Sequence, residues 1–460
     1  MTAAGAWLQS RALAFKIFGV GFLGLVLLIP LSLVRSTLDE RATRRTEAIS
    51  EITRVWGDTQ QLVGPILIVP YTHRVVSENW VAPGGQRMLE TSSREETSEA
   101  FFLPESLDVI GTIETSTRQR GIYRADVYSA QVRLTGHFAK PNFAFTGATA
   151  IEPQWQHAHV YFGVSDLRGA RGALALGWNG TSYPVEPTGR SSLFGPGVQT
   201  EVPMNVDATG ADFSLAFTVN GSGGFFVAPL GRTTHIHLAS AWPDPSFAGA
   251  FLPTSRSVGP NGFQADWQLS YYGSAVPPQW SDRGTRTPPT AQVIRESTLG
   301  VNFHEVVNAY RTVDRATKYG VLFIALVLGV FFLFEILAGV RLHALNYLLV
   351  GSALCLFYLA LLALSEFLAF ALAYSVAATA SVALIGCYSR SILARRARAW
   401  TVSMMISGVY AYLYFVLQME DFSLLAGTAA LFAIVGALMF ATRRVRPAPP
   451  PPLSAAPAAV

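Results

Sequence analysis

The sequence predicts a membrane α-helical bundle of six transmembrane helices and a large, mostly-β extracytoplasmic domain. The first observation is a set of six apolar runs, each close to the ~20 residues that a helix needs to cross a bilayer. The second is the polar segment 35–318, which separates the first run from the other five. The runs are Ile17–Val34, Tyr319–Val340, Leu345–Leu364, Phe367–Tyr388, Trp400–Met419 and Phe422–Ala441.

The apolar runs are expected to be helices, because a backbone inside lipid must satisfy its own N–H and C=O groups. The run from Tyr319 contains one charged residue, Glu335, and the four runs after it contain none. A charge at the centre of a span costs ~2.5–3.5 kcal/mol on insertion scales, so this distribution is typical of membrane spans. We therefore divide the C-terminal part into a five-helix bundle over 319–441 and a cytoplasmic Pro/Ala-rich tail over 442–460.

The basic residues predict the orientation of the chain in the membrane. Suppose that the N-terminus is cytoplasmic. Lys or Arg then lie inside in the head 1–16, at the joint at Arg341, in the loop after the fourth run and in the tail. The charged residues of the outer joints 365–366 and 420–421 are all acidic. This asymmetry follows the positive-inside rule. Several arginines just after the first run oppose it, but long segments cross the membrane largely regardless of charge. We expect a multi-pass membrane protein with both termini cytoplasmic and 35–318 on the outer side, which in a bacterium means the periplasm.

The first run, 17–34, is expected to remain as an uncleaved anchor. No small-x-small cleavage pattern follows it, since the sequence there reads Leu33-Val34-Arg35-Ser36. Helical periodicity continues from Leu38 to Trp56 and predicts a stalk that ends at Gly57. A second apolar stripe over Phe303–Lys318 predicts a returning stalk that packs against the first.

Strand patterns dominate the rest of the outer segment. Large apolar residues at every second position of Phe213–Val219 are followed by a glycine-rich turn from Asn220 and a second apolar run, Phe225–Val227, which predicts a β-hairpin. Similar strand-like stretches occur at Tyr123–Phe138, Gln154–Val164 and Thr233–Ser240. We expect a mostly antiparallel sheet or sandwich.

Nothing in the sequence points to an enzyme, and we expect no cofactor and no catalytic residue. The phosphate-binding loop, H-E-x-x-H and G-x-S-x-G patterns are all absent. Two His-x-His pairs, His157/His159 and His235/His237, lack the carboxylate or Cys pattern that would complete a metal site, so no metal is expected. The formal net charge of +4 gives no reason to propose nucleic acid as a partner.

Acidic residues in or beside the spans are the candidate functional residues. Glu335 lies ~7 Å from the cytoplasmic end of its predicted helix, at ~1.5 Å per residue, where Arg341 or His343 is a feasible partner. A carboxylate at this depth is either functional or within reach of water. A second acidic group at the outer mouth either marks helix ends and topology or contacts a cation or partner. That group is Glu366, Glu420 and Asp421.

Several longer strings give the chain a family resemblance. In the bundle they include Phe331-Phe-Leu-Phe-Glu-Ile-Leu, Arg341-Leu-His-Ala-Leu-Asn-Tyr and Leu364-Ser-Glu-Phe, and in the outer segment Trp56-Gly-x-x-Gln60, Arg120-Gly-Ile-Tyr and Trp242-Pro-x-Pro-Ser-Phe. Over roughly residues 10–445 the sequence resembles the CreD family of bacterial inner-membrane proteins. The resemblance implies an association with cell-envelope integrity and the envelope-stress response, and brings no catalytic residues. Phe367 stands where a His would be expected after Ser-Glu, which weakens the idea of a proton relay there.

The resulting functional hypothesis is a non-enzymatic protein that supports cell-envelope integrity and the stress response. Its helices would lie in the lipid bilayer, and its periplasmic domain would bind another envelope protein or a cell-wall component. A transporter or lipid-handling membrane protein is the alternative, motivated by Glu335 and the outer acidic residues. That alternative predicts a polar cavity within the bundle. The sequence leaves the oligomeric state open.

Overall fold

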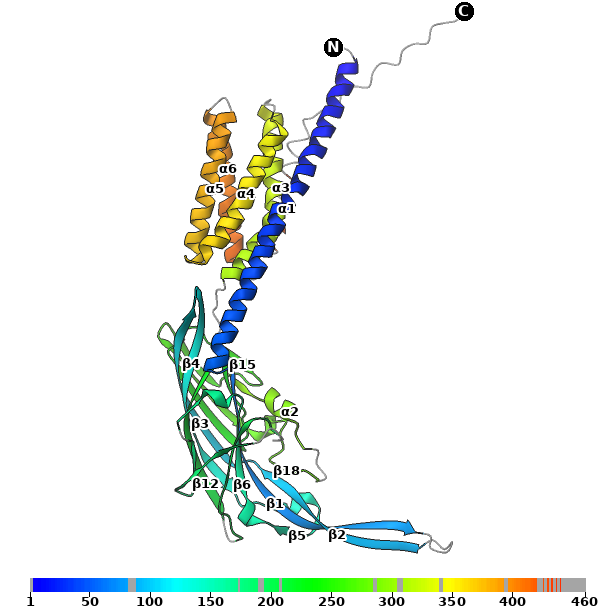
Figure 1. Ribbon diagram of the computed structural model, residues 1–460, viewed down its shortest axis with the longest axis vertical. Helices are drawn as coiled ribbons and strands as arrows, with labels where there is room; N and C mark the ends of the chain where they lie inside the picture. The colour runs from blue at the N-terminus through cyan, green and yellow to red at the C-terminus, as the bar shows by residue number, and fades with distance from the viewer. Residues whose placement is uncertain are drawn as a thin grey trace, which may run out of the picture. The chain divides into compact units, whose positions relative to one another are not determined.

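The computed structural model divides into two compact units (Figure 1). The helical unit comprises Met1–Arg45 and Val307–Val460, and the β domain comprises Thr46–Val306. The structure describes residues 3–81, 88–172, 174–188, 194–206, 209–283, 288–303, 309–338, 342–392 and 396–419, and single positions at 425, 428, 429, 432, 436 and 439.

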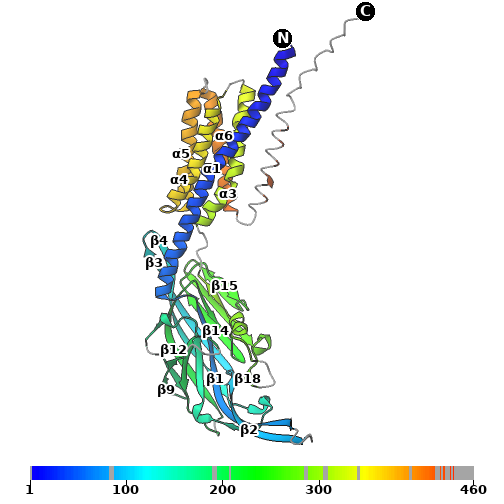
Figure 2. The same ribbon diagram turned by 45° about the vertical axis from the view of Figure 1, so that its right-hand side comes forward.

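Long helices build the helical unit, and one of them continues into the β domain. They are α1 (Ala3–Trp56), α3 (Ala309–Ala338), α4 (Ala344–Ser365), α5 (Phe370–Ile392) and α6 (Arg396–Gln418). Figures 1 and 2 show α3 to α6 side by side, with α1 running along them. Gly351 lets α1 approach α4 closely, because a Cβ added there would lie 2.0 Å from Leu27 Cδ1.

The predicted count of six spans is not reached within the described residues. Four helices there are long and apolar enough to cross a membrane, namely Phe18–Trp56, Ala344–Ser365, Phe370–Ile392 and Arg396–Gln418. The second predicted run lies in helix α3 as far as Ala338 but is not among these four. The sixth run, 422–441, falls almost wholly outside the described residues. Helices with a large, mostly-β domain are therefore confirmed, whereas the number six is not.

Helix α1 passes without interruption from the first predicted span through the predicted stalk. Its 54 residues include Pro30, and the helix ends where Gly57 adopts φ 137°, a conformation that favours glycine. Residues 304–308 of the returning stalk lie outside the described residues. One face of the stalk within α3 is buried: Val313 and Ala316 belong to the same apolar cluster as Leu38 of α1.

Two sheets form most of the β domain, which also contains the end of α1, the short helix α2 (Ala291–Glu296) and short 3-10 helices. The first sheet contains β1 (Gln60–Val81), β2 (Met88–Phe102), β5 (Thr149–Pro153), β6 (His159–Val164), β10 (Glu186–Pro187), β11 (Gly197–Glu201), β13 (Gly224–Val227), β15 (Ser246–Gly249), β18 (Gln279–Ser281) and β19 (Leu299–Asn302). The second contains β3 (Ser106–Arg120), β4 (Tyr123–Ala139), β7 (Ala170–Arg171), β8 (Ala175–Trp178), β9 (Thr181–Pro184), β12 (Gly210–Ser222), β14 (Thr233–Ser240), β16 (Ser255–Gly259) and β17 (Gly262–Ser270).

The core of the β domain lies between the two sheets. Leu67 and Val69 of the first sheet share one buried cluster with Leu134 and Leu238 of the second. Period-two alternation places one face of each strand inward, and in β12 the predicted residues from Phe213 to Val219 alternate between buried and exposed or half-buried positions as expected. The predicted sandwich is therefore observed in outline.

The predicted hairpin between Phe213–Val219 and Phe225–Val227 is wrong. Strand β12 continues to Ser222, so only Gly223 (φ 72°) separates it from β13. The common tight hairpins need a loop of at least two residues. The chain therefore crosses between sheets: β12 pairs with β4 in the second sheet, and β13 pairs with β1 and β19 in the first.

Strands β1 and β2 form a hairpin arm, defined here as the pairs from Val75↔Arg94 to Val81↔Met88. Strand β5 pairs with β1 only between Tyr71 and Arg74, and β18 pairs with β2 only between Ala100 and Phe102. Within the described residues, the arm is thus a ribbon of two strands, which projects from the sandwich (Figure 1).

Candidate functional site

Glu335 is buried near the end of α3, where three helices meet. Its side chain is 7% exposed. One carboxylate oxygen, Oε1, is paired with the ammonium of Lys16 on α1 and accepts a hydrogen bond from the Leu342 N–H at 3.0 Å. The other, Oε2, accepts from the Tyr347 hydroxyl of α4 at 2.6 Å. The carboxylate therefore ties α1, α3 and α4 together.

This arrangement gives each carboxylate oxygen a partner and supplies a compensating charge. A buried carboxylate is tolerated when it is paired and hydrogen-bonded. The Leu342 N–H lies just beyond α3, so the same carboxylate also holds the chain where it turns back towards α4. We call this group of Lys16, Glu335, Leu342 and Tyr347 the brace, because its contacts connect three helices at one end of the helical unit.

The partner of Glu335 differs from the one the sequence suggested. His343 is exposed at the N-cap of α4, and within the described residues no hydrogen bond or ion pair joins it to Glu335. Arg341 lies outside the described residues. The missed partner, Lys16, directly precedes the first apolar run. The positive-inside rule had already placed Lys16 at the same end of the bundle as Glu335, which is the signal that could have found the pair.

Glu366, at the C-cap of α4, makes a second link between the same three helices. Its Oε1 lies 3.6 Å from Arg41 Nη1 of α1 and accepts a hydrogen bond from the Tyr310 hydroxyl of α3 at 3.3 Å. The cation at this carboxylate is thus a residue of the chain itself. Glu420 and Asp421, predicted to lie beside it, fall outside the described residues.

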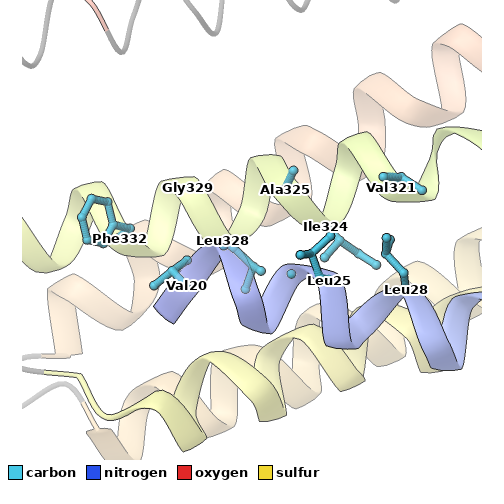
Figure 3. Close-up of a pocket in the computed structure, with 11 residues that line it drawn as sticks. Val20, Leu25, Leu28, Val321, Ile324, Ala325, Leu328, Gly329 and Phe332 are labelled. Atoms are coloured by element: carbon cyan, nitrogen blue, oxygen red, sulfur yellow. The ribbon is translucent and has the colours of Figure 1, made fainter. Parts of the chain in front are cut away.

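An apolar groove runs between α1 and α3 (Figure 3). Its volume is about 320 Å³, and Val20 lies close to Phe332 at one end while Leu28 lies close to Val321 at the other. The groove is lined by Val20, Gly21, Gly24, Leu25, Leu28, Val321, Ile324, Ala325, Leu328, Gly329 and Phe332. None of these side chains is polar, so this space is not the polar cavity that a transporter would require.

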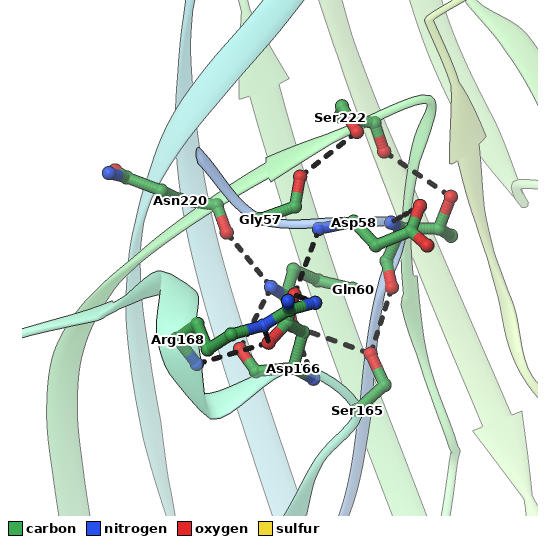
Figure 4. A network of polar contacts seen from close by, with 9 residues as sticks. Gly57, Asp58, Gln60, Ser165, Asp166, Arg168, Asn220 and Ser222 are labelled. Carbon is green, nitrogen blue, oxygen red and sulfur yellow. Dashed lines mark hydrogen bonds and ion pairs between the residues drawn. The ribbon is translucent and has the colours of Figure 1, made fainter. Parts of the chain in front are cut away.

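A polar network surrounds the point where α1 ends and β1 begins (Figure 4). The Gln60 side chain is 0% exposed, and its Nε2 donates to the backbone oxygens of Asp166 at 3.1 Å and Asn220 at 2.8 Å. Its Oε1 accepts from the Asp166 N–H at 3.3 Å. A single amide therefore joins β1 to the β6–β7 connection and to β12.

Asp166 extends this network towards the surface. Its carboxylate accepts from the Asp58 N–H at 3.1 Å and from Arg168 Nε and Nη2, each at 2.9 Å (Figure 4). The hydrogen bonds from Arg168 lower the pKa of the Asp166 carboxyl below its ordinary value. At the junction between α1 and β1, the hydrogen bonds therefore favour the charged form of the Asp166 carboxyl.

Gly57 and Trp56 complete the junction. A Cβ on Gly57 would lie 2.5 Å from the Asn220 carbonyl oxygen, so only glycine fits there. The Trp56 indole N–H donates to the Tyr128 carbonyl at 3.1 Å, and the Arg118 guanidinium lies 4.3 Å from the Trp56 ring centre. Sequence reasoning singled out Trp56-Gly-x-x-Gln60 only as part of a family resemblance. The structure gives these residues a shared role in joining helix to sheet.

The His-x-His pairs make no metal centre that the structure shows. His237 Nδ1 lies 2.6 Å from Asp266 Oδ1, and this hydrogen bond lowers the pKa of the Asp266 carboxyl. His159 Nδ1 lies 3.2 Å from the His157 carbonyl. No group of three or more His, Cys, Asp and Glu side chains placed to hold a metal ion occurs in the part of the chain that the structure describes.

Comparison with known proteins accounts for nearly the whole chain. A family model described as "Inner membrane protein CreD" matches residues 12–446. The chain is 32% identical over 431 residues to the inner membrane protein CreD of Escherichia coli (strain K12), a match that covers 92% of this chain and 90% of the relative. The apolar helices fit the location that both names give. The chain therefore belongs to the CreD family of inner membrane proteins.

Proposed function

We propose that this protein supports cell-envelope integrity under stress by binding an envelope partner through its β domain, and that it does so without enzymatic activity. In this proposal the β domain lies in the periplasm and both termini lie in the cytoplasm, as the distribution of basic residues predicts. Membership of an inner-membrane family supports the location of the helices.

The observation that carries the proposal is a hollow in the second sheet. Strand β14 ends at Ser240, opposite Ile113 of β3, whereas β3 continues to Arg120. The space beyond the end of β14 is bounded on its other side by the turn between β16 and β17, and it has a volume of about 730 Å³. This volume lies in the range of ligand pockets.

The lining of this hollow suits a neutral polar partner. Residues with hydroxyl and amide side chains from four neighbouring strands, β3, β14, β16 and β17, and from the β16–β17 turn line it, with Glu114 as its one carboxylate. These polar lining residues are Thr112, Thr115, Ser240, Ser257, Asn261 and Gln264. Such groups both donate and accept hydrogen bonds, which matches the hydroxyls and amides of a cell-wall glycan or an extended peptide.

Photo-crosslinking in living cells tests this proposal. A photoreactive side chain at Asn261 or Thr115 should capture an envelope protein or cell-wall material. The matched control is Thr181, which is exposed on β9 at the opposite edge of the same sheet. Equal capture at Thr181, or none at Asn261 and Thr115, would contradict the hollow as the binding site. Full envelope function from a chain that lacks the β domain would contradict the wider proposal.

The alternative function, transport or lipid handling, rests on the buried carboxylate of Glu335. Its three donors already satisfy both carboxylate oxygens, as expected of a brace. Flux or lipid transfer in proteoliposomes that is lost in Glu335→Gln, while the protein remains folded, would favour the alternative.

A further inference from the structure

The edge of β3 that borders the hollow has no strand beside it after Ile113. Strand β14 pairs with β3 from Ser106 to Ile113 and ends there, whereas β4 accompanies β3 on its other side as far as Arg120. Within the described residues, no strand pairs with Glu114–Arg120 on the side away from β4. An edge strand of this kind presents a row of unpaired N–H and C=O groups, which is a template for pairing with another chain.

The β3–β4 hairpin shows which backbone groups face the hollow. Its loop has two residues, so Arg120 and Tyr123 form the hydrogen-bonded pair that closes it. Hydrogen-bonded and non-hydrogen-bonded pairs alternate along an antiparallel ladder, and the register from Arg120 back to Ser106 contains no shift. The even-numbered residues of β3 therefore bond to β4. Thr115, Thr117 and Gln119 direct their N–H and C=O groups away from β4, along the free edge.

The hollow has the width of one strand. Strand β14 lies between β3 and β17 in the order of the sheet, and neighbouring strands are ~4.7–4.9 Å apart. Where β14 ends, β3 and the β16–β17 turn therefore enclose a space that one further strand would fill. The β3–β4 hairpin extends past β14 at this end (Figure 2). A strand placed in the hollow would continue the line of β14 along the free edge of β3.

We propose that the hollow takes an extended peptide segment of an envelope protein, which adds as a strand to the edge of β3 at Glu114–Arg120. This inference rests on the proposed function of the hollow and commits it to a peptide rather than a glycan. Main-chain hydrogen bonds supply the affinity when a peptide extends a sheet in this way. A segment of about seven residues, ~23 Å long at ~3.3 Å per residue, would occupy the whole edge.

The charges along the edge favour an uncharged peptide. The Arg118 guanidinium lies 4.3 Å from the Trp56 ring centre, and Arg120 is paired with Glu51 at 2.7 Å. Both cations thus have partners within the chain itself. Glu114 would repel acidic side chains, and the three residues after it are Thr, Ser and Thr. A glycan has no backbone repeat of N–H and C=O groups, so it would leave the edge of β3 unpaired.

Photo-crosslinking of the full chain in living cells tests the proposal, with the photoreactive side chain at Asn261. The variant Thr115→Pro/Thr117→Pro removes two N–H donors from the free edge, where proline is tolerated in a sheet. Capture should fall at least ~fivefold, as expected for the loss of two backbone hydrogen bonds. The matched control, Thr115→Val/Thr117→Val, removes the hydroxyls but keeps both N–H groups, so it should retain capture. Mass spectrometry of the adduct should identify a linear peptide of another protein.

The outcomes separate this inference from the proposed function on which it rests. Capture that survives the two prolines, capture that is lost with valine but not with proline, or an adduct that contains amino sugars would overturn strand addition and leave the hollow as a binding site. No capture at Asn261 in the otherwise unchanged chain would overturn both. Thermal unfolding checks that the variants are folded. If the double proline variant is not, Thr117→Pro alone should still lower capture at least ~twofold.

Discussion

Lys16 and Glu335 are separated by 319 positions in the sequence and form an ion pair that joins α1 to α3. The Leu342 N–H and the Tyr347 hydroxyl complete the carboxylate's hydrogen bonds. Arg41, Tyr310 and Glu366 link α1, α3 and α4 a second time. Helices α1, α3 and α4 are thus joined by these two polar links as well as by apolar packing.

Removing one partner of the Lys16–Glu335 pair should destabilise the protein more than removing both. Lys16→Met leaves a buried carboxylate without its cation. We expect a loss of about 2–3 kcal/mol, below the 3–5 kcal/mol of a fully buried pair, since Lys16 is 35% exposed. Thermal unfolding in detergent measures this, and the double variant Lys16→Met/Glu335→Gln should recover much of the loss. Glu40→Gln, which breaks the exposed Arg44–Glu40 pair, is the control and should cost at most ~0.5 kcal/mol.

Tyr347→Phe should destabilise the helical unit without altering its charge. The substitution removes the donor at 2.6 Å from Glu335 Oε2, and the loss of a hydrogen bond to a charged group costs about 1.5–3 kcal/mol. Tyr388→Phe removes a hydroxyl that donates to neutral Asn346 at 3.0 Å, so it should shift the unfolding temperature less. A larger shift for Tyr388→Phe would contradict the brace.

Gly57→Ala should disrupt the junction between α1 and β1. The new Cβ would lie 2.5 Å from the Asn220 oxygen, at φ 137°, and we expect a loss of at least ~2–3 kcal/mol from backbone strain and the forced shift. Gly121→Ala is the control, because Gly121 also has a positive φ (61°) but open space around it. Denaturant unfolding followed by tryptophan fluorescence measures both, and equal losses would show that the close contact is unimportant.

Acid should weaken the junction through Asp166. Its folded pKa lies below the ordinary value of 3.8 because of the hydrogen bonds from Arg168. A depressed carboxyl pKa contributes stability that is present above the unfolded value and is lost as the pH falls through the folded value. The stability of the wild-type β domain should therefore fall below pH ~4, and Asp166→Asn should flatten this part of the profile. Arg168→Met should raise the folded pKa of Asp166, so that the loss of stability becomes smaller and ends at a higher pH. An unchanged profile in both variants would refute the assignment.

The orientation of the chain is open to direct measurement. Gly180 lies in an exposed turn between β8 and β9. In a chain without Cys355 and Cys387, Gly180→Cys should react with a membrane-impermeant maleimide added to intact spheroplasts. Reaction only after lysis would place the β domain in the cytoplasm and remove the basis of the proposed function.

Local patterns predicted the elements, whereas contacts distant in sequence decided their partners. The alternation in Phe213–Val219 correctly identified the inward face of β12, because side-chain direction depends only on neighbouring residues. The same stretch misled us about pairing, since the length of β12 and the single residue Gly223 determine which sheet β13 joins. Hydropathy located Glu335 near a helix end, but its pairing with Lys16 depends on how α1 and α3 pack. The role of Gln60 could not be predicted from local patterns either, because its partners Asp166 and Asn220 are 106 and 160 positions away.

The crossing at Gly223 has a further consequence for how the β domain loses its structure. The hydroxyl of Ser222, the last residue of β12, donates to the Gly57 carbonyl at 3.0 Å, and the Ser222 backbone carbonyl accepts from the Thr59 hydroxyl at 3.3 Å. The place where the chain leaves one sheet for the other is therefore also where α1 gives way to β1. The two sheets therefore cannot separate without breaking these hydrogen bonds. The domain should accordingly melt in a single cooperative transition, with equal calorimetric and van't Hoff enthalpies.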